Sequence, residues 1–298
     1  MSPNPDSKTY AAFALSMIIG GANFIAVSLS NRELPPLFSA TLRFGLASLL
    51  FSVIARAWRI PLARGRDAVG AVFYGLLNVG VSYALMYYAL VGLSAGTVAI
   101  ISATTPLFTF AIAVLFGQEH FYINRVVGGI LAIIGIVILG GFGGNFVLSY
   151  FVAALLSTVA FAASSVVAKA YPNVHPLNMN AIGTAAGTLL LAVSSLIFDE
   201  QWVFPHESTT WIAVGWLVIV GSVGLFQLWL FVIKRWTASA TVYSLTGMPV
   251  IAAVLGIVIL DQPVTLEVIA GGVLVITAVY VGAIARPSET TKLPPKEA

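Results

Sequence analysis

Two stretches decide the fold: SAGTVAIISATTPLFTFAIAVLFGQEHFYINRVVGGILAIIGIVI at 94–138 and TASATVYSLTGMPVIAAVLGIVILDQPVTLEVIAGGVLVITAVYV at 237–281. Each begins with small residues, passes through Thr-Val to a proline, continues as a long apolar run and crosses a polar loop to a Gly-Gly pair. The interval from the proline to the first of these glycines is 22 residues in both stretches. Thr97 and Thr241 match only after a shift of one residue, so this is a weak internal repeat.

The composition indicates that most of the chain lies in lipid. Apolar residues make up 59% of the 298 residues and charged residues 8%, whereas a soluble domain carries about 25% charged residues. Each membrane crossing needs about 20 apolar residues. We therefore predict an all-α membrane protein with ten transmembrane helices, at 8–29, 35–57, 67–91, 95–117, 124–140, 146–170, 179–198, 209–234, 238–260 and 265–285.

The repeat divides these helices into two halves of five. Because five is odd, the second half enters the membrane from the opposite face, and such inverted repeats are typical of secondary transporters. We expect a first repeat at 1–145 and a second at 146–285. The polar, proline-rich residues 286–298 are expected to form a disordered cytoplasmic tail.

The basic residues give the orientation. Ten spans place both termini on one side, and the opposite side receives only Arg32. The side with more lysine and arginine in its loops is normally cytoplasmic. We therefore expect a multi-pass protein of the inner (cytoplasmic) membrane with both termini in the cytoplasm. The basic residues on that side are Lys8, Arg56, Arg59, Arg64, Arg66, Arg125, Lys169, Lys234, Arg235, Arg286, Lys292 and Lys296.

The sequence resembles the drug/metabolite transporter superfamily, and within it the ten-helix EamA-type exporters. The resemblance rests on GGANFIAVSLSNRELPPLFSATLRF at 20–44, YYALVGLSAGTVAIISATTPLFTFAIAVLFGQE at 87–119 and TVYSLTGMPVIAAVLGIVILDQPVT at 241–265. It covers nearly the whole chain and implies an exporter of small metabolites in the cytoplasmic membrane. The YddG-like amino-acid exporters are the preferred neighbours, but these motifs do not name a substrate.

The polar groups expected in the membrane core are neutral. All eleven acidic residues and all three histidines fall in loops, tails or helix ends. Neutral amides, hydroxyls and aromatic rings suit a zwitterionic or amphipathic solute in a central cavity, and the alternative is hydrogen bonding between helices. The candidate substrate-binding residues are Asn23, Tyr74, Asn78, Ser82, Ser102, Gln227, Trp229 and Tyr243.

Arg43 is the one charged residue expected well inside a span, about 10 Å from the outer end of its helix at 1.5 Å per residue. It is a candidate contact for the carboxylate of an amino acid. The alternative is a structural role, in which it bonds backbone carbonyls or extends outward towards Glu33. Tyr83, Tyr87 and Tyr88 are candidate anchors at the membrane interface.

Two prolines are candidate hinges. Pro106 and Pro249 are expected near the middle of the fourth and ninth helices, where proline removes a backbone hydrogen bond. We expect each helix to flex there between outward-open and inward-open states. The alternative is a fixed kink that shapes the cavity.

Other function classes fit less well. A membrane enzyme would need a constellation such as H-E-x-x-H or G-x-S-x-G, and neither occurs in the sequence. A channel would need a filter motif or a ring of charge. Multidrug or other metabolite transport remains an alternative. We expect a small-molecule substrate and the lipid bilayer as partners, no cofactor, no metal and no nucleic acid, and a monomer.

Overall fold

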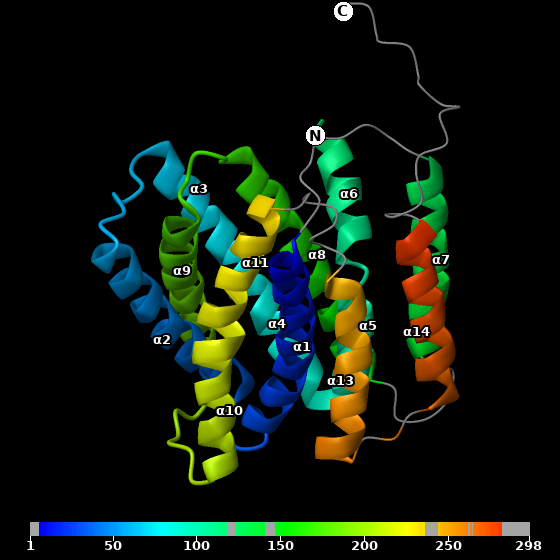
Figure 1. Ribbon diagram of the computed structural model, residues 1–298. Coiled ribbons are helices and arrows are strands. Elements are labelled where there is room, and N and C mark those ends of the chain that lie inside the picture. Colours follow the sequence, from blue (N-terminus) through cyan, green and yellow to red (C-terminus); the bar gives the residue numbers. More distant parts are fainter. Residues whose placement is uncertain are drawn as a thin grey trace, which may run out of the picture.

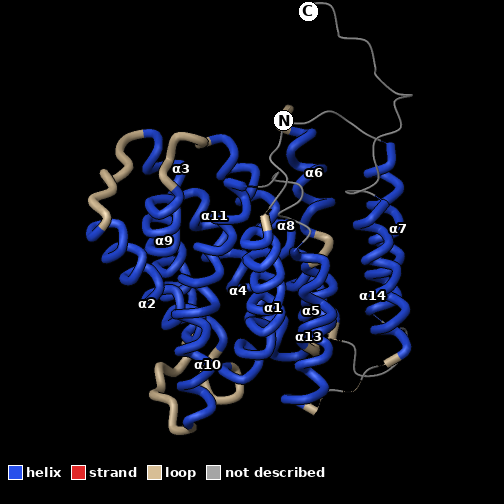
Figure 2. Tube along the Cα trace, viewed as in Figure 1, coloured by secondary structure: helices blue, strands red, loops and turns tan. Residues whose placement is uncertain are grey.

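The computed structural model describes residues 6–117, 123–140, 147–235, 244–261, 263 and 265–281. Helices joined by loops make up this part of the chain, as Figure 2 shows. Seven helical stretches in it are long and apolar enough to cross a membrane, and shorter apolar helices cover Gly247–Leu260 and Leu266–Ala278. The seven are Ser7–Ser30, Pro36–Ala57, Arg66–Gly92, Ala95–Leu115, Leu148–Ala170, Pro176–Ile197 and Ser208–Trp229. The predicted all-α membrane fold is confirmed.

The helices follow the predicted spans closely. Five of the predicted spans are single unbroken helices, whose ends lie within three residues of the prediction. They are α1 (Ser7–Ser30), α2 (Pro36–Ala57), α7 (Ile123–Gly140), α8 (Leu148–Ala170) and α9 (Pro176–Ile197). The last helix of the second half is α14 (Leu266–Val279).

Two predicted spans contain a π-helical segment. The third is α3 (Arg66–Gly75), η1 (Leu76–Ser82) and α4 (Tyr83–Gly92). The eighth is α10 (Ser208–Val218), η2 (Ile219–Gly224) and α11 (Leu225–Arg235). The π-helix is rare and often occurs at functional sites. These two helices occupy equivalent places in the two halves, so the irregularity belongs to the repeat.

Close helix contacts accompany both segments. A Cβ atom built on Gly75 would lie 1.9 Å from the carbonyl oxygen of Gly183 on α9. One built on Gly221 would lie 2.2 Å from the side-chain oxygen of Asn23 on α1. At Gly75 the backbone of α9 leaves room for glycine alone, whereas at Gly221 the nearest atoms belong to the side chain of Asn23.

The fourth span corrects the prediction for Pro106. This span is broken into α5 (Ala95–Ser102) and α6 (Thr105–Leu115), so Pro106 lies in the first turn of α6 and not in the middle of an unbroken helix. Proline is well tolerated there because the first N–H groups of a helix have no partner within it. Pro249, in contrast, lies inside α13 (Ser244–Leu260), as predicted.

The helices alternate in direction, which supports the inverted arrangement. In Figure 1, α1 begins at the top and α14 ends at the top. Equivalent helices run oppositely: α1 descends and α8 ascends, and α5 with α6 ascends while α13 descends. The helices α7 and α14 pack against each other at one edge of the molecule. The predicted repeat boundary at 145/146 and the tail at 286–298 fall outside the described residues.

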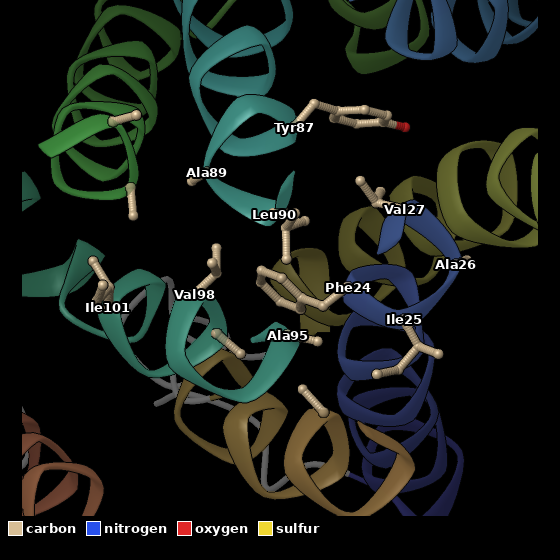
Figure 3. Close-up of a cluster of buried hydrophobic side chains, with 14 of the residues drawn as sticks. Phe24, Ile25, Ala26, Val27, Tyr87, Ala89, Leu90, Ala95, Val98 and Ile101 are labelled. Carbon is tan, nitrogen blue, oxygen red and sulfur yellow. The ribbon is translucent and has the colours of Figure 1, made fainter. Parts of the chain in front are cut away.

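The main hydrophobic core lies towards the lower end of Figure 1. It joins the C-terminal ends of α1 and α4 to α5 and to the beginning of α8. In Figure 3, Phe24 of α1 points towards Leu90 of α4 and Val98 of α5. The chain is therefore closely packed at the end that the loop 31–35 occupies.

Candidate functional site

Arg43 lies at the centre of a polar cluster and is fully buried, with 0% of its surface exposed. Its Nε donates to Ser222 Oγ at 3.0 Å, and one terminal nitrogen donates to the carbonyl oxygen of Gly221 at 3.2 Å. The other terminal nitrogen donates to Tyr87 Oη at 3.4 Å. Arg43 therefore bonds η2 of the opposite half and does not extend outward towards Glu33.

Aromatic rings surround the guanidinium. Its central carbon lies 4.6 Å from the centre of the Phe44 ring and 5.1 Å from that of Tyr83. Such cation–π contacts stabilise a positive charge away from water. Tyr87 is 0% exposed and bonds Arg43, so the prediction that it is an interfacial anchor is wrong. Its neighbour Tyr88 is exposed near the helix end, where an anchor is expected.

Asn23 reaches the same carbonyl group as Arg43. Its Nδ2 donates to the Gly221 oxygen at 3.1 Å, and its Oδ1 accepts a hydrogen bond from Trp216 Nε1 at 3.2 Å. Ser222 Oγ in turn donates to the carbonyl oxygen of Leu217, five residues earlier in the chain. Side chains from α1 and α2 thus converge on η2, and two of the predicted site residues meet there.

A second polar cluster lies between α3, η1 and α9. Asn78 Nδ2 donates to Tyr74 Oη at 2.6 Å, and Tyr74 Oη donates to Asn180 Oδ1 at 3.5 Å. The structure therefore brings Tyr74 and Asn78 together on one face, as their spacing of four residues indicates. This face is turned towards α9.

Two of the predicted residues carry buried atoms with no hydrogen-bond partner among the described residues: Asn78 Oδ1 and Gln227 Nε2. A buried, unpaired polar atom is unfavourable and calls for an explanation in a native structure. Of the remaining candidates, Ser82 is buried, Ser102 and Trp229 are half-buried, and Tyr243 lies outside the described residues.

Several contributors to these clusters were not predicted. In the sequence, nothing distinguishes Gly221, Ser222 and Trp216 from other residues of an apolar helix. Asn180 is one of several polar residues near a helix end. They act through contacts with residues more than one hundred positions away, such as Arg43 with Gly221 and Tyr74 with Asn180. No local pattern marks such positions.

No carboxylate of the described residues lies beside Arg43. The acidic residues in this part of the chain lie in loops, beside helix ends or in the first turn of a helix: Asp6, Glu33, Asp67, Asp199, Glu200, Glu207, Asp261 and Glu267. The partners recorded for Arg43 are instead a serine, a tyrosine, a backbone carbonyl and two rings. The cluster thus holds a positive charge that the described side chains do not neutralise.

Comparisons with known proteins agree with this architecture. A solved crystal structure superposes with a TM-score of 0.68 at 20% sequence identity, covering 94% of this chain and 98% of the other, which shows a shared fold. An uncharacterized transporter of Archaeoglobus fulgidus is 25% identical, over 92% of this chain and 98% of its own. The uncharacterized inner membrane transporter YedA of Escherichia coli (strain K12) is 28% identical, over 91% and 89%.

Some of the similar proteins have a functional name. The "Probable amino-acid metabolite efflux pump" of Escherichia coli (strain K12) is 22% identical, over 90% of this chain and 92% of its own. The profile of the EamA-like transporter family matches twice, at residues 7–141 and 148–283, once in each predicted half. A transporter family accounts for the fold, the two halves and the buried polar clusters, and an enzyme is set aside. The chain is a multi-pass membrane protein that belongs to the EamA-like transporter family.

Proposed function

We propose that this secondary transporter exports amino acids with aromatic or other neutral side chains across the cytoplasmic membrane by alternating access. The observation that carries the proposal is the buried charge of Arg43. An ionisable residue inside a membrane normally pairs with an opposite charge or lies on a substrate path. A substrate carboxylate supplies the counter-charge that the described side chains do not.

The guanidinium of Arg43 still has N–H donors free to bind a carboxylate. Arginine has five N–H donors, and three hydrogen bonds of Arg43 use one donor each on its three nitrogens. One N–H group therefore remains on each terminal nitrogen. The unpaired Asn78 Oδ1 is an acceptor that suits the ammonium group of a zwitterion, and the unpaired Gln227 Nε2 is a further donor for its carboxylate. The name of the amino-acid efflux relative supports the same substrate class.

The direction and the coupling complete the proposal. The excess of basic residues in one set of loops favours a cytoplasmic location for both termini, with 1–145 and 146–285 as the repeats and 286–298 as a cytoplasmic tail. The usual proton relays of transporters are carboxylates or histidines inside the membrane. Because the acidic residues are expected at the helix ends, transport should proceed without a proton or sodium gradient.

Counterflow in liposomes tests the substrate class. Purified protein is reconstituted with internal L-phenylalanine, and uptake of labelled L-phenylalanine is measured with no ion gradient. L-Leucine should compete, whereas phenylalaninamide and phenethylamine, which lack the carboxylate, should compete poorly. Efficient competition by phenethylamine, or flux of a cationic drug with no flux of amino acids, would refute amino acids as the substrate class and favour multidrug transport.

A further inference from the structure

Among the described residues, every hydrogen-bond acceptor of Arg43 is neutral. They are a hydroxyl of Ser222, a hydroxyl of Tyr87 and the carbonyl of Gly221. Hydrogen bonds between a guanidinium and a carboxylate are roughly twice as strong as neutral ones, and the planar fork matches both oxygens of the carboxylate. In a site of low dielectric this difference grows. A substrate carboxylate therefore competes strongly with the contacts that Arg43 makes in this structure.

The acceptors in η2 keep a partner when Arg43 leaves. The carbonyl of Gly221 also accepts from Asn23 Nδ2 at 3.1 Å, and Ser222 Oγ donates to the carbonyl of Leu217 at 2.8 Å. The contact with Tyr87 is long, at 3.4 Å. A buried polar group that loses all its hydrogen bonds destabilises the protein by about 1–3 kcal/mol. The remaining hydrogen bonds of Gly221 and Ser222 avoid this loss in η2. Departure of the guanidinium therefore costs little free energy at its two acceptors in η2.

These contacts are a polar connection between α2 and the middle of the eighth span. Arg43 lies on α2, and both of its acceptors in the second half lie in η2. Asn23 makes a parallel connection from α1 to the same carbonyl. When Arg43 leaves, η2 loses these hydrogen bonds to α2 but keeps the hydrogen bond to Asn23 of α1. The π-helical segment is the natural place for the change, because its hydrogen bonding already departs from the α-helix.

We propose that Arg43 is a switch that the substrate operates: the substrate carboxylate takes the guanidinium from Gly221 and Ser222, and this release lets η2 move relative to α2. The proposal rests on the transport of carboxylate-bearing substrates proposed above. It adds that substrate binding itself, through this one exchange of hydrogen bonds, starts the conformational change. An ion gradient is not needed for that step.

Spin labels on the two elements test the exchange. The chain has no cysteine, so Leu46→Cys on α2 and Ile219→Cys in η2 introduce the only two thiols. Both native side chains are exposed, with 42% and 63% of their surface accessible, so each position has room for a label. Double electron–electron resonance in liposomes then gives the distance distribution without ligand, with L-phenylalanine and with phenylalaninamide. We expect a second distance population with the amino acid and none with the amide.

Two further variants make the result specific. Arg43→Gln should abolish the shift caused by L-phenylalanine. Ser222→Ala removes one resting contact, so the second population should appear without substrate. Ser52→Ala on α2 is the matched control, since it removes a hydroxyl that bonds only the preceding turn at 2.8 Å, and it should behave as the parent.

The outcomes separate this inference from the proposed function. If the labelled protein shows no counterflow of L-phenylalanine, the proposed function fails. If it transports L-phenylalanine while the distances stay unchanged, or if Arg43→Gln shows the same shift as the parent, the switch is refuted and amino-acid transport stands.

Discussion

The carboxylate of Glu200 accepts a hydrogen bond from the backbone N–H of Leu37 at 3.1 Å, across the boundary between the two halves. Its other oxygen accepts from the N–H of Phe38 at 2.7 Å. The helix α2 begins after Pro35 with no side-chain cap of its own, so its first free N–H groups need an external acceptor. Glu200, from the loop between α9 and α10, supplies it.

A second carboxylate makes the reciprocal contact. Glu33, in the loop between α1 and α2, accepts hydrogen bonds from the backbone N–H groups of His206 and Glu207 at the beginning of α10. The two glutamates therefore connect the pair α1–α2 to the pair α9–α10 at the end of the molecule opposite the basic loops. This connection holds that end together in the conformation described.

The contact of Glu200 predicts a loss of stability in Glu200→Gln. An amide has one acceptor oxygen where the carboxylate has two, so Leu37 or Phe38 loses its partner. We expect a loss of about 1 kcal/mol, the usual value of a helix cap, visible as a lower Tm in detergent. Glu207→Gln is the control, because Glu207 precedes α10 without a side-chain capping bond. An unchanged Tm in Glu200→Gln would contradict the role of the cap.

The contact of Glu33 predicts a pH dependence. The hydrogen bond from the backbone N–H of His206 is the main cause that lowers the pKa of Glu33 below its ordinary value. A group with a lowered pKa in the folded state stabilises the protein above its unfolded pKa and loses this effect as the pH falls through the folded one. The Tm of the wild type should therefore exceed that of Glu33→Gln at neutral pH. The two values should converge in acid, and a difference that does not depend on pH would refute the ionic contact.

The prolines differ in their structural positions, and this predicts different effects. Pro249 lies inside α13, where it leaves a carbonyl of the preceding turn without its usual N–H partner. Pro249→Ala should slow turnover severalfold in counterflow while the substrate affinity changes little. Pro106→Ala should have a smaller effect, because Pro106 occupies the first turn of α6. If Pro249→Ala transports at the wild-type rate, the proline only shapes the helix and is not a hinge.

The unpaired amide of Gln227 predicts a variant that weakens transport without lowering stability. Gln227→Leu removes a buried donor that has no partner in the described structure, so the Tm should stay the same or rise. If Gln227 binds substrate, KM should rise about tenfold, equivalent to about 1.4 kcal/mol. The contrasting variant is Asn178→Leu, which loses a bond to the Pro61 carbonyl at 2.5 Å and should lower the Tm without changing KM. A lower Tm with an unchanged KM in Gln227→Leu would assign that side chain to packing.

Hydropathy predicted the spans because lipid imposes one length and one composition on any helix that crosses it. It did not predict η1 and η2, since they accompany contacts made after folding, such as Gly75 against Gly183 and Gly221 against Asn23. The break before Pro106 was missed for a related reason: a proline is compatible with a kink inside a helix and with the start of a new one.

The sequence located Arg43 inside a span but left its role open. Its partners Gly221 and Ser222 lie 178 and 179 residues further along the chain. They are small residues in an apolar stretch, and nothing in their local pattern marks them. The same holds for Tyr87, whose position near a helix end suggested the interface, whereas the fold turns it towards the guanidinium.

Calorimetric titration of the purified protein tests directly whether Arg43 recognises a substrate carboxylate. We expect the wild type to bind L-phenylalanine at least about tenfold more tightly than phenylalaninamide, because the amide loses one charge-assisted contact. Arg43→Gln should bind the two compounds equally. Equal affinities in the wild-type protein, or a preference for the acid that persists in Arg43→Gln, would show that Arg43 does not bind the carboxylate.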